Sequence, residues 1–371
     1  IVVRELKHNF VDLGSSPPSN SYLPKEELNE PQKCYPLKVM VCDTCWLVQT
    51  EDFVKADTMF ASDYAYFSSF STSWLDHAKD YVTKVLSKFG LNSKSMVVEI
   101  ASNDGYLLQF IKDNYIPCYG IEPTHNTAKA ARDKGIEVVE EFFGVDLATR
   151  LVKQECQADL LIANNVLAHV PDINDFVQGF SILLKPNGIA TFEFPHVLNL
   201  IKNNQFDTIY HEHYSYLSFT AVCNIFDSNG LAVFDVEQIP THGGSLRVYA
   251  QLSDSRRYAI NKNVTDLQEK EDQAGINSIN LYRGFQKKAE DIKTIFLSFL
   301  NQAKNNEHSV VGYGAAAKGS TLLNFSGVQK DLLPYVVDKN NAKQDKFMPG
   351  SRVPIVSEEQ LKMDKPDYVV I

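Results

Sequence analysis

A cluster of chemically active side chains lies between positions 210 and 216 of the sequence. It holds two imidazoles, one carboxylate and three phenols, namely Tyr210, His211, Glu212, His213, Tyr214 and Tyr216. An imidazole can accept a proton, a carboxylate can orient it, and phenols can donate hydrogen bonds to a developing oxyanion. The stretch is therefore a candidate catalytic loop. Closely spaced histidines also occur in surface loops and metal sites, so the rest of the chain must decide between these uses.

A second candidate site is the acidic turn in the segment EIASNDGYLLQF. Glu99, Asn103, Asp104 and Gly105 follow an apolar run and precede a helical segment, and doubly wound sheets bind ligands at such strand ends. A turn with one glycine is poorly suited to a pyrophosphate, whereas carboxylates suit a cationic or amine-bearing ligand. Glu122, after the next apolar run, is placed to accept hydrogen bonds from ribose hydroxyls. The pattern favours S-adenosylmethionine (SAM) over NAD; a turn without function is the alternative.

Further side chains are expected along the same edge of the sheet. Asn164, Asn165 and His169 follow a buried apolar run and predict one wall of the cofactor site. Several aromatic residues could close over a ligand or belong to the core: Tyr64, Tyr66, Phe142 and Phe143.

Two glycine-containing turns later in the chain are candidate substrate sites. In PTHGGS, Gly243 and Gly244 permit close approach of the backbone to a ligand, and His242 supplies another imidazole; a plain hairpin turn is the alternative. In VVGYGAAAKG, a strand ends in a Gly-x-Gly turn that begins a helix, so main-chain N–H groups can bind a phosphate with Lys318 nearby. The turn is not GxGxxG, because Ala317 stands in the place of the third glycine. A nucleotide or nucleotide-sugar diphosphate is the expected ligand.

The composition bounds the class of protein. The 371 residues are 44% apolar and 22% charged, which is typical of a globular chain of two or three domains. Acidic residues outnumber Lys and Arg by 46 to 36, which argues against nucleic acid and membrane surfaces as partners and favours small molecules. No signal peptide or membrane-spanning run is recognisable, and the six cysteines form no disulfide framework. A cytoplasmic protein with reduced cysteines is expected.

An α/β architecture follows from the alternation of short apolar runs and helical segments after Ser95. Strands of a parallel sheet are expected at Met96–Ile100, Cys118–Ile121, Glu137–Val139, Leu160–Ala163 and Ile189–Phe194. Residues 253–276 predict a linker or an exposed helix, and Leu281–Phe299 an amphipathic helix between two domains. The expected division is a small module at 1–60, a central domain at 61–255, the linker and helix at 256–308, and a Rossmann-like domain at 309–371.

Cys42 and Cys45 have the spacing of half a zinc knuckle. Tetrahedral zinc needs two further ligands, and only the isolated Cys34 and His8 are near in sequence. An unmetallated pair is therefore as good an interpretation as a zinc site. The chain begins at Ile1 without Met, so a first cysteine pair could precede it.

Taken in order, these segments resemble one family. VDLGSSPPSNSYL, CDTCWLVQ, EIASNDGYLL, YGIEP, NNVLAHVPD, FEFPH, YHEHYSYLS, HGGSLRVY and GYGAAAKGSTLLN all match SAM-dependent C-methyltransferases of nucleotide-linked deoxysugar biosynthesis, of the sugar C3-methyltransferase type. The resemblance implies a zinc-binding module, a class I Rossmann-like SAM domain and a Rossmann-like domain that holds the nucleotide-sugar. It implies structural zinc in the complete protein, although this chain has only Cys42 and Cys45 of the ligand set.

The resemblance also implies residue roles. His213 would be the general base with Glu212 beside it and Tyr210 nearby, removing a proton next to the 4-keto group so that the enolate takes the methyl group with inversion. The cofactor-binding residues would be Tyr64, Glu99, Ser102, Asn103, Asp104, Gly105, Glu122, Pro123, Phe143, Asn164, Asn165 and His169. The substrate-binding residues would be His242, Gly243, Tyr313, Gly314, Lys318, Thr321 and Asn324. A monomer is expected, and His211 would be structural.

Three alternatives remain open at this point. An O- or N-methyltransferase of a nucleotide-sugar would share the fold and would need no acidic C–H bond. A nucleotide-sugar-binding protein without catalysis would keep the fold but not the cofactor. An NAD-dependent dehydrogenase is suggested only by the Gly-x-Gly turn near Lys318.

Overall fold

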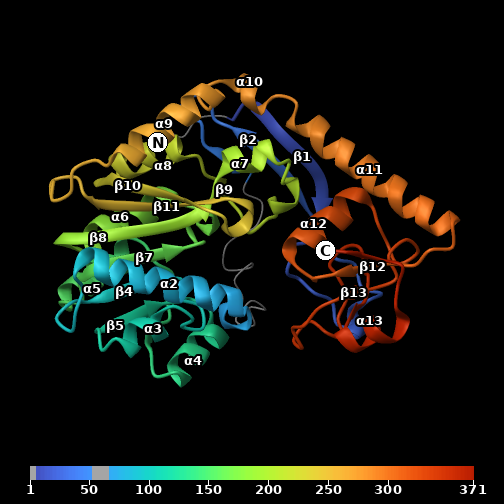
Figure 1. Ribbon diagram of the computed structural model, residues 1–371, viewed down its shortest axis with the longest axis horizontal. Helices are drawn as coiled ribbons and strands as arrows, with labels where there is room; N and C mark the ends of the chain where they lie inside the picture. Colours follow the sequence, from blue (N-terminus) through green and yellow to red (C-terminus); the bar gives the residue numbers. More distant parts are fainter. Residues whose placement is uncertain (1–5, 52–66) are drawn as a thin grey trace.

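The computed structural model describes residues 6–51 and 67–371, which contain a small antiparallel sheet, a large mixed sheet and a small parallel sheet (Figure 1). The first has the order β1-β2-β3-β9, with β1 at His8–Ser16, β2 at Tyr35–Val41, β3 at Val48–Thr50 and β9 at Ser215–Tyr216. The small module expected at 1–60 thus contains short strands. Strand β9 belongs to the histidine-rich cluster and pairs antiparallel with β3, Val48 opposite Tyr216. The N-terminal module thus holds one end of the candidate catalytic loop.

The large sheet has the order β10-β11-β8-β7-β4-β5-β6. All five expected strands are confirmed, as β4 (Val97–Ile100), β5 (Cys118–Ile121), β6 (Glu137–Val139), β7 (Ala158–Asn164) and β8 (Leu184–Pro195). They are parallel, and the hairpin β10 (Leu231–Ile239) and β11 (Ser245–Leu252) adds to β8 antiparallel. Strands such as β7 are almost wholly buried because helices cover both faces.

The helices around this sheet begin and end where local signals require. Ser71 caps α2 by accepting from the Trp74 N–H at 3.3 Å, and the left-handed Gly90 ends it with a φ of 65°. Ala78, Tyr81 and Val85 form the buried face of this helix. The helices are α2 (Thr72–Phe89), α3 (Leu108–Asp113), α4 (His125–Asp133), α5 (Val145–Lys153), α6 (Ile173–Leu183), α7 (Val197–Lys202) and α8 (Phe219–Ser228). Short 3-10 turns occupy Lys25–Glu27, Ser68–Phe70, Leu167–His169, Phe206–Thr208 and Thr241–Gly243.

An arch of three helices links the large sheet to the C-terminal unit (Figure 1). It consists of α9 (Lys262–Ala274), α10 (Ile279–Tyr282) and α11 (Phe285–Asn305). The expectation of a linker or exposed helix at 253–276 was incomplete, because Glu271 of α9 is fully buried and accepts from His196 and from two N–H groups at the start of α8. The single helix expected at Leu281–Phe299 is wrong at its start, because Gly284, with a φ of 85°, separates α10 from α11.

The C-terminal unit is a parallel sheet of order β14-β13-β12-β15. Its strands are β12 (Val310–Tyr313), β13 (Val336–Val337), β14 (Ile355–Val356) and β15 (Tyr368–Val370), and its helices are α12 (Ala317–Ser326) and α13 (Glu358–Asp364). The expected strand, Gly-x-Gly turn and helix are present as β12 and α12. In the part of the chain that the structure describes, no helix has the length and apolar character needed to cross a membrane.

Candidate active site

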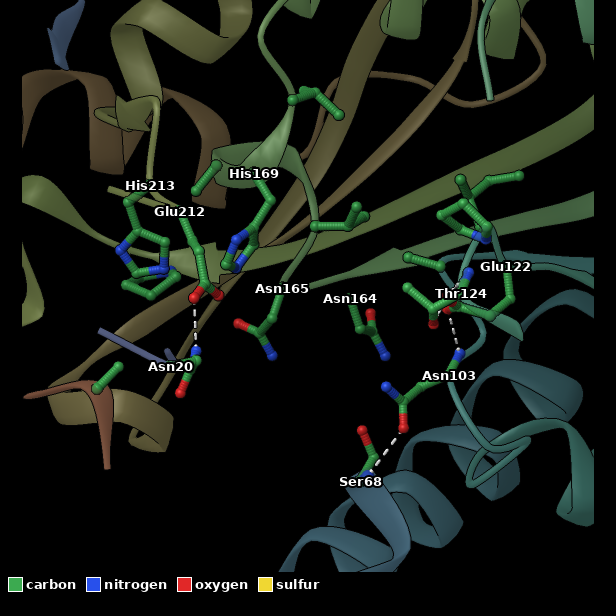
Figure 2. A pocket seen from close by; sticks show the side chains of 18 of the residues that line it. Asn20, Ser68, Asn103, Glu122, Thr124, Asn164, Asn165, His169, Glu212 and His213 are labelled. Carbon is green, nitrogen blue, oxygen red and sulfur yellow. Dashed lines mark hydrogen bonds between the residues drawn. The ribbon is translucent and has the colours of Figure 1, made fainter. Parts of the chain in front are cut away.

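A cavity of about 410 Å³ lies between the three units and is lined by residues from each of them. Figure 2 shows polar side chains at both ends of it, with Asn103, Glu122 and Thr124 at one end and Glu212 and His213 at the other. The predicted site residues that line it are Asn103, Glu122, Pro123, Phe143, Asn164, Asn165, His169, Tyr210, Glu212, His213, His242 and Lys318.

Four other predicted site residues lie in β4 or in the acidic turn that follows it. Glu99 is 1% exposed, and this burial raises the pKa of its carboxyl well above the usual range, so it is a poor anion for a ligand. Ser102 is also buried. Asp104 is buried and pairs with Lys134 at 3.2 Å. Gly105 has a φ of 75°, and a Cβ there would lie 2.4 Å from Ile136. These four residues shape the turn and do not line the cavity.

The remaining predicted residues lie outside the lining or outside the described chain. Thr321 donates to the main-chain oxygen of Ile209 at 2.8 Å, and Asn324 donates to that of Pro349 at 3.1 Å. The Tyr313 hydroxyl donates to Glu358 at 2.5 Å, and Gly314, with a φ of 97°, makes the turn before α12. Gly243 accepts from Gln205. These contacts are structural in the protein without ligand. Tyr64, like Tyr66, falls outside the described residues.

Glu122 organises the acidic end of the cavity. Its carboxylate accepts from the main-chain N–H of Asn103 at 2.9 Å and of Thr124 at 2.9 Å, and from the Thr124 hydroxyl. Burial raises the pKa of Glu122, and these donors oppose that rise. Asn103 adopts a left-handed φ of 49° and accepts from the N–H of Ser68 at 2.9 Å. One buried carboxylate therefore fixes the turns that follow both β4 and β5.

Asn164 and Asn165 present polar atoms between the two ends (Figure 2). Asn165 has a left-handed φ of 52°, and its N–H donates to the Glu193 main-chain oxygen at 2.7 Å. Among the described residues, Asn164 Oδ1 and both amide atoms of Asn165 are buried without a hydrogen-bond partner. Buried polar atoms rarely stay unsatisfied, and strained backbone gathers at ligand sites. This edge of the sheet therefore fits a polar ligand such as SAM. Phe143, which also lines the cavity, packs edge-on against Phe176 and Phe180.

His213 has the geometry of a neutral general base. Its Nδ1 lies 2.9 Å from the main-chain oxygen of Thr208. A carbonyl oxygen can only accept, so Nδ1 carries the hydrogen and Nε2 keeps the lone pair. Burial, together with the His169 imidazole, holds the pKa of His213 well below its usual range. The ring is therefore neutral near pH 7, as a base requires.

The side chains near His213 differ in what they contact. The rings of Tyr210 and His169 lie 4.0 Å and 4.6 Å from the His213 ring, centre to centre. His211 instead lies on the main-chain oxygen of Tyr35 at 3.1 Å, within the N-terminal module, which agrees with its expected structural role. The carboxylate of Glu212 accepts from Nδ2 of Asn20 at 2.6 Å.

The C-terminal unit contributes a basic wall to the cavity. Ala316, Ala317 and Lys318 at the start of α12 line it, as does Lys343 from the loop after β13. Alanine at the N-cap position offers no side-chain acceptor to the first N–H groups of α12. Lys343 donates to the main-chain oxygen of Ala315 at 2.8 Å. Lys343 also pairs with the Asp338 carboxylate at 3.7 Å. The helix N-terminus beside Lys318 suits a phosphate.

Zinc does not fit the described residues. No group of three potential metal ligands is present in 6–51 and 67–371. Among the described residues, Cys42 and Cys45 have no third ligand beside them. His8, one of the two candidate additional ligands, lies 3.3 Å from the Asp43 carboxylate.

Sequence reasoning missed several residues of the site. Asn20, Trp74 and Lys343 line the cavity but were not among the predicted site residues. Thr208 and Ser68 act through main-chain atoms, which no residue type reveals. Only Thr208 carried a usable signal, because it lies five residues before His213.

Three domain families match successive parts of the chain. A candidate zinc-binding domain matches residues 4–60, a methyltransferase domain matches 74–236, and a C-methyltransferase C-terminal domain matches 240–371. Among solved structures, the chain is similar to magnesium protoporphyrin IX methyltransferase of Synechocystis with bound SAM, at 14% identity over 48% of this chain and 79% of that one, with a TM-score of 0.37. It is also similar to a protein of Pyrococcus horikoshii, at 11% identity over 51% and 95%, with a TM-score of 0.41.

The curated relative is more informative. The C-methyltransferase NovU of Streptomyces niveus is 33% identical over 363 residues, which cover 98% of this chain and 86% of that protein. The similarity spans all three units that form the cavity. The chain therefore belongs to the SAM-dependent C-methyltransferase family and is a SAM-dependent methyltransferase of the class I α/β fold.

Proposed function

We propose that this enzyme methylates C3 of a nucleotide-linked 4-keto-deoxysugar, next to the ketone, after His213 has removed a proton from that carbon. The observation that carries the proposal is the hydrogen bond from His213 Nδ1 to the Thr208 oxygen at 2.9 Å. It leaves Nε2 as a proton acceptor on a residue that lines a cavity with an acidic end and a basic end.

The two ends suit the two reactants. Asn103, Glu122, Asn164 and Asn165 would hold SAM, through the carboxylate and the unsatisfied amides described above. SAM supplies an electrophilic methyl group to the substrate carbon when it is bound there. The start of α12, with Lys318 and Lys343, would hold the diphosphate of a nucleotide-sugar. The sugar then lies between the ends, next to His213.

The proton transfer follows from the state of His213. A ketone acidifies the neighbouring C–H bond, because the electron pair left on carbon moves to the ketone oxygen as an enolate. Nε2 of neutral His213 takes the proton and becomes an imidazolium, while the Thr208 oxygen keeps the ring in place. Nδ2 of Asn165 and the hydroxyl of Tyr210 are donors from residues that line the cavity, and one of them can stabilise the enolate oxygen.

The test is the chemical position of the transferred methyl group. The enzyme is incubated with methyl-13C-labelled SAM and thymidine- or uridine-diphosphate-linked 4-keto-6-deoxyhexoses, and the product is examined by NMR. A carbon-bound methyl group supports the proposal. An oxygen- or nitrogen-bound methyl group would instead identify the O- or N-methyltransferase alternative, and failure to bind SAM in calorimetry would contradict catalysis altogether.

His213→Asn is the matched variant, because its amide can still donate to the Thr208 oxygen while the basic nitrogen is lost. We expect kcat to fall roughly 100- to 10,000-fold, the usual contribution of general base catalysis. The SAM dissociation constant should stay within about twofold, since the cofactor end is unchanged. Wild-type kcat in His213→Asn would refute the assignment of the base.

A further inference from the structure

We infer that Asn20 of the N-terminal module is a positioning residue that aims the carboxylate of Glu212 at a substrate hydroxyl beside the base. The inference rests on the proposed function and deepens it. It gives the N-terminal module a part in the chemistry that is independent of any metal.

The contact itself joins distant parts of the chain. Nδ2 of Asn20 donates to Oε1 of Glu212 at 2.6 Å, across 192 positions of sequence. An ionised carboxylate can only accept, so the amide nitrogen must face it. Both residues line the cavity, and Figure 2 shows the Glu212 carboxylate directed toward Asn20, away from the backbone of the loop. Glu212 is therefore presented to the cavity, while the Thr208 oxygen serves Nδ1 of His213.

Asn20 is held in place by the C-terminal unit. The Ser320 hydroxyl donates to the main-chain oxygen of Ser19 at 3.0 Å. The Tyr22 hydroxyl donates to the Ala315 oxygen at 2.7 Å and lies 3.3 Å from Oδ1 of Asn20. Ala315 immediately precedes the start of α12, where we place the diphosphate. The segment that orients Glu212 is thus built against the nucleotide end of the cavity.

The chemistry of the amide suits this role. A neutral donor fixes one oxygen of Glu212 without neutralising its charge, whereas a lysine would form an ion pair and compete with the substrate. A carboxylate fixed in this way is a strong acceptor for a sugar hydroxyl. Tyr22 is electrostatically linked to Glu212 and to Asp338. The other titratable groups of this part of the cavity lining are His169, Tyr210, His213, His242, Lys318 and Lys343.

Asn20→Asp tests the contact without any substrate. It places two carboxylates within hydrogen-bonding distance, so the folded state raises the pKa of one of them above the unfolded value. The folded protein then binds more protons than the unfolded chain, and stability falls as pH rises through this range. We expect the melting temperature of Asn20→Asp to match or exceed that of Asn20→Ala near pH 5 and to fall below it near pH 8. Asn9→Asp, at an exposed position of β1 in the same module, should follow the wild type at every pH. A gap that is constant across pH would overturn the inference.

The same variants test the role. Relative to the wild type, kcat/KM of Asn20→Asp for the nucleotide-linked sugar should fall with rising pH and be at least about tenfold lower at pH 8, the loss expected for one hydrogen bond to a charged group. Asn20→Ala should lose a similar factor at all pH values, because its loss does not depend on a proton. Wild-type kcat/KM in both variants would overturn the inference even if the melting series behaved as expected. No methyl transfer by the wild type would refute the proposed function, while the melting series would still report on the contact.

Discussion

Two turns of the same kind face the cavity from opposite sides and carry opposite charge. Each follows a parallel strand and precedes a helix, β4 to α3 in the large sheet and β12 to α12 in the C-terminal unit. Beside the first turn, Glu122 from the turn after β5 lines the cavity. Beside the second, Lys318 of α12 and Lys343 from the loop after β13 line it. The topology thus provides two similar edges, and we expect the charge of a few side chains to decide which ligand each edge binds.

The edges also differ in how their main-chain donors are used. At the acidic edge, N–H groups of Asn103 and Thr124 are already occupied by Glu122. At the basic edge, the N-cap Ala316 supplies no acceptor for the start of α12. Donors that are already paired cannot bind an anion, whereas the first N–H groups of an uncapped helix can. The comparison predicts that substitutions at one edge leave the ligand of the other edge unaffected.

The largest effect on binding is expected for Glu122→Ala. The variant leaves two main-chain N–H groups without their charged acceptor. We expect the free energy of SAM binding to weaken by about 2–3 kcal/mol, which raises the SAM dissociation constant roughly 30- to 150-fold. Uridine diphosphate should bind as in the wild type. Calorimetry measures both, with Asp146→Ala, an exposed carboxylate of α5, as the control. Equal losses for both ligands would remove the distinction between the edges.

A smaller effect is expected for Lys318→Ala. Loss of one ammonium group should raise the dissociation constant of uridine diphosphate roughly tenfold, the effect expected of a hydrogen bond to a charged group. The dissociation constant of SAM should not change. The exposed Lys330 of the same unit provides the control Lys330→Ala. Because charge pairing is screened by ions, the difference between the two variants should shrink at high salt. A loss of SAM affinity with Lys318→Ala would contradict the assignment of the basic edge.

The smallest effect concerns the pH dependence of kcat. Burial, and then nearby charges including Lys318, lower the pKa of His213, so wild-type kcat should be level near pH 7 and fall only when acid protonates the base. Removing the charge in Lys318→Ala should raise that pKa and move the fall toward higher pH. Glu122→Ala should leave it in place. Steady-state rates at saturating substrate, measured across pH, give the pH at which kcat falls. A shift of this fall toward lower pH in Lys318→Ala would contradict the effect of Lys318 on the pKa of His213.

Local patterns in the sequence predicted much of the fold. The five parallel strands, α2 and the β12–α12 turn each have a periodicity or capping signal within a few residues. The buried Glu271 in α9 was missed because its helix is polar along most of its length, and only the distant His196 and α8 explain its burial. Such a contact leaves no trace in the local pattern.

The site was predicted unevenly for the same reason. Residues in motifs, such as Glu122, Asn165 and His213, line the cavity as expected. Glu99 does not, because its position in the middle of a buried strand removes it from the cavity. The contact of Asn20 with Glu212 has no local signal in the sequence, because it joins side chains 192 positions apart. The division of the chain into domains remains a prediction.

The central claim is that His213 removes a proton from a carbon next to a ketone. Deuterium incorporation at that carbon in deuterated water, with S-adenosylhomocysteine in place of SAM, measures this step alone. The wild type should introduce deuterium into the nucleotide-linked 4-keto-sugar, and His213→Asn should lose this activity roughly 100- to 10,000-fold. No incorporation by the wild type, or equal incorporation by the variant, would contradict the claim.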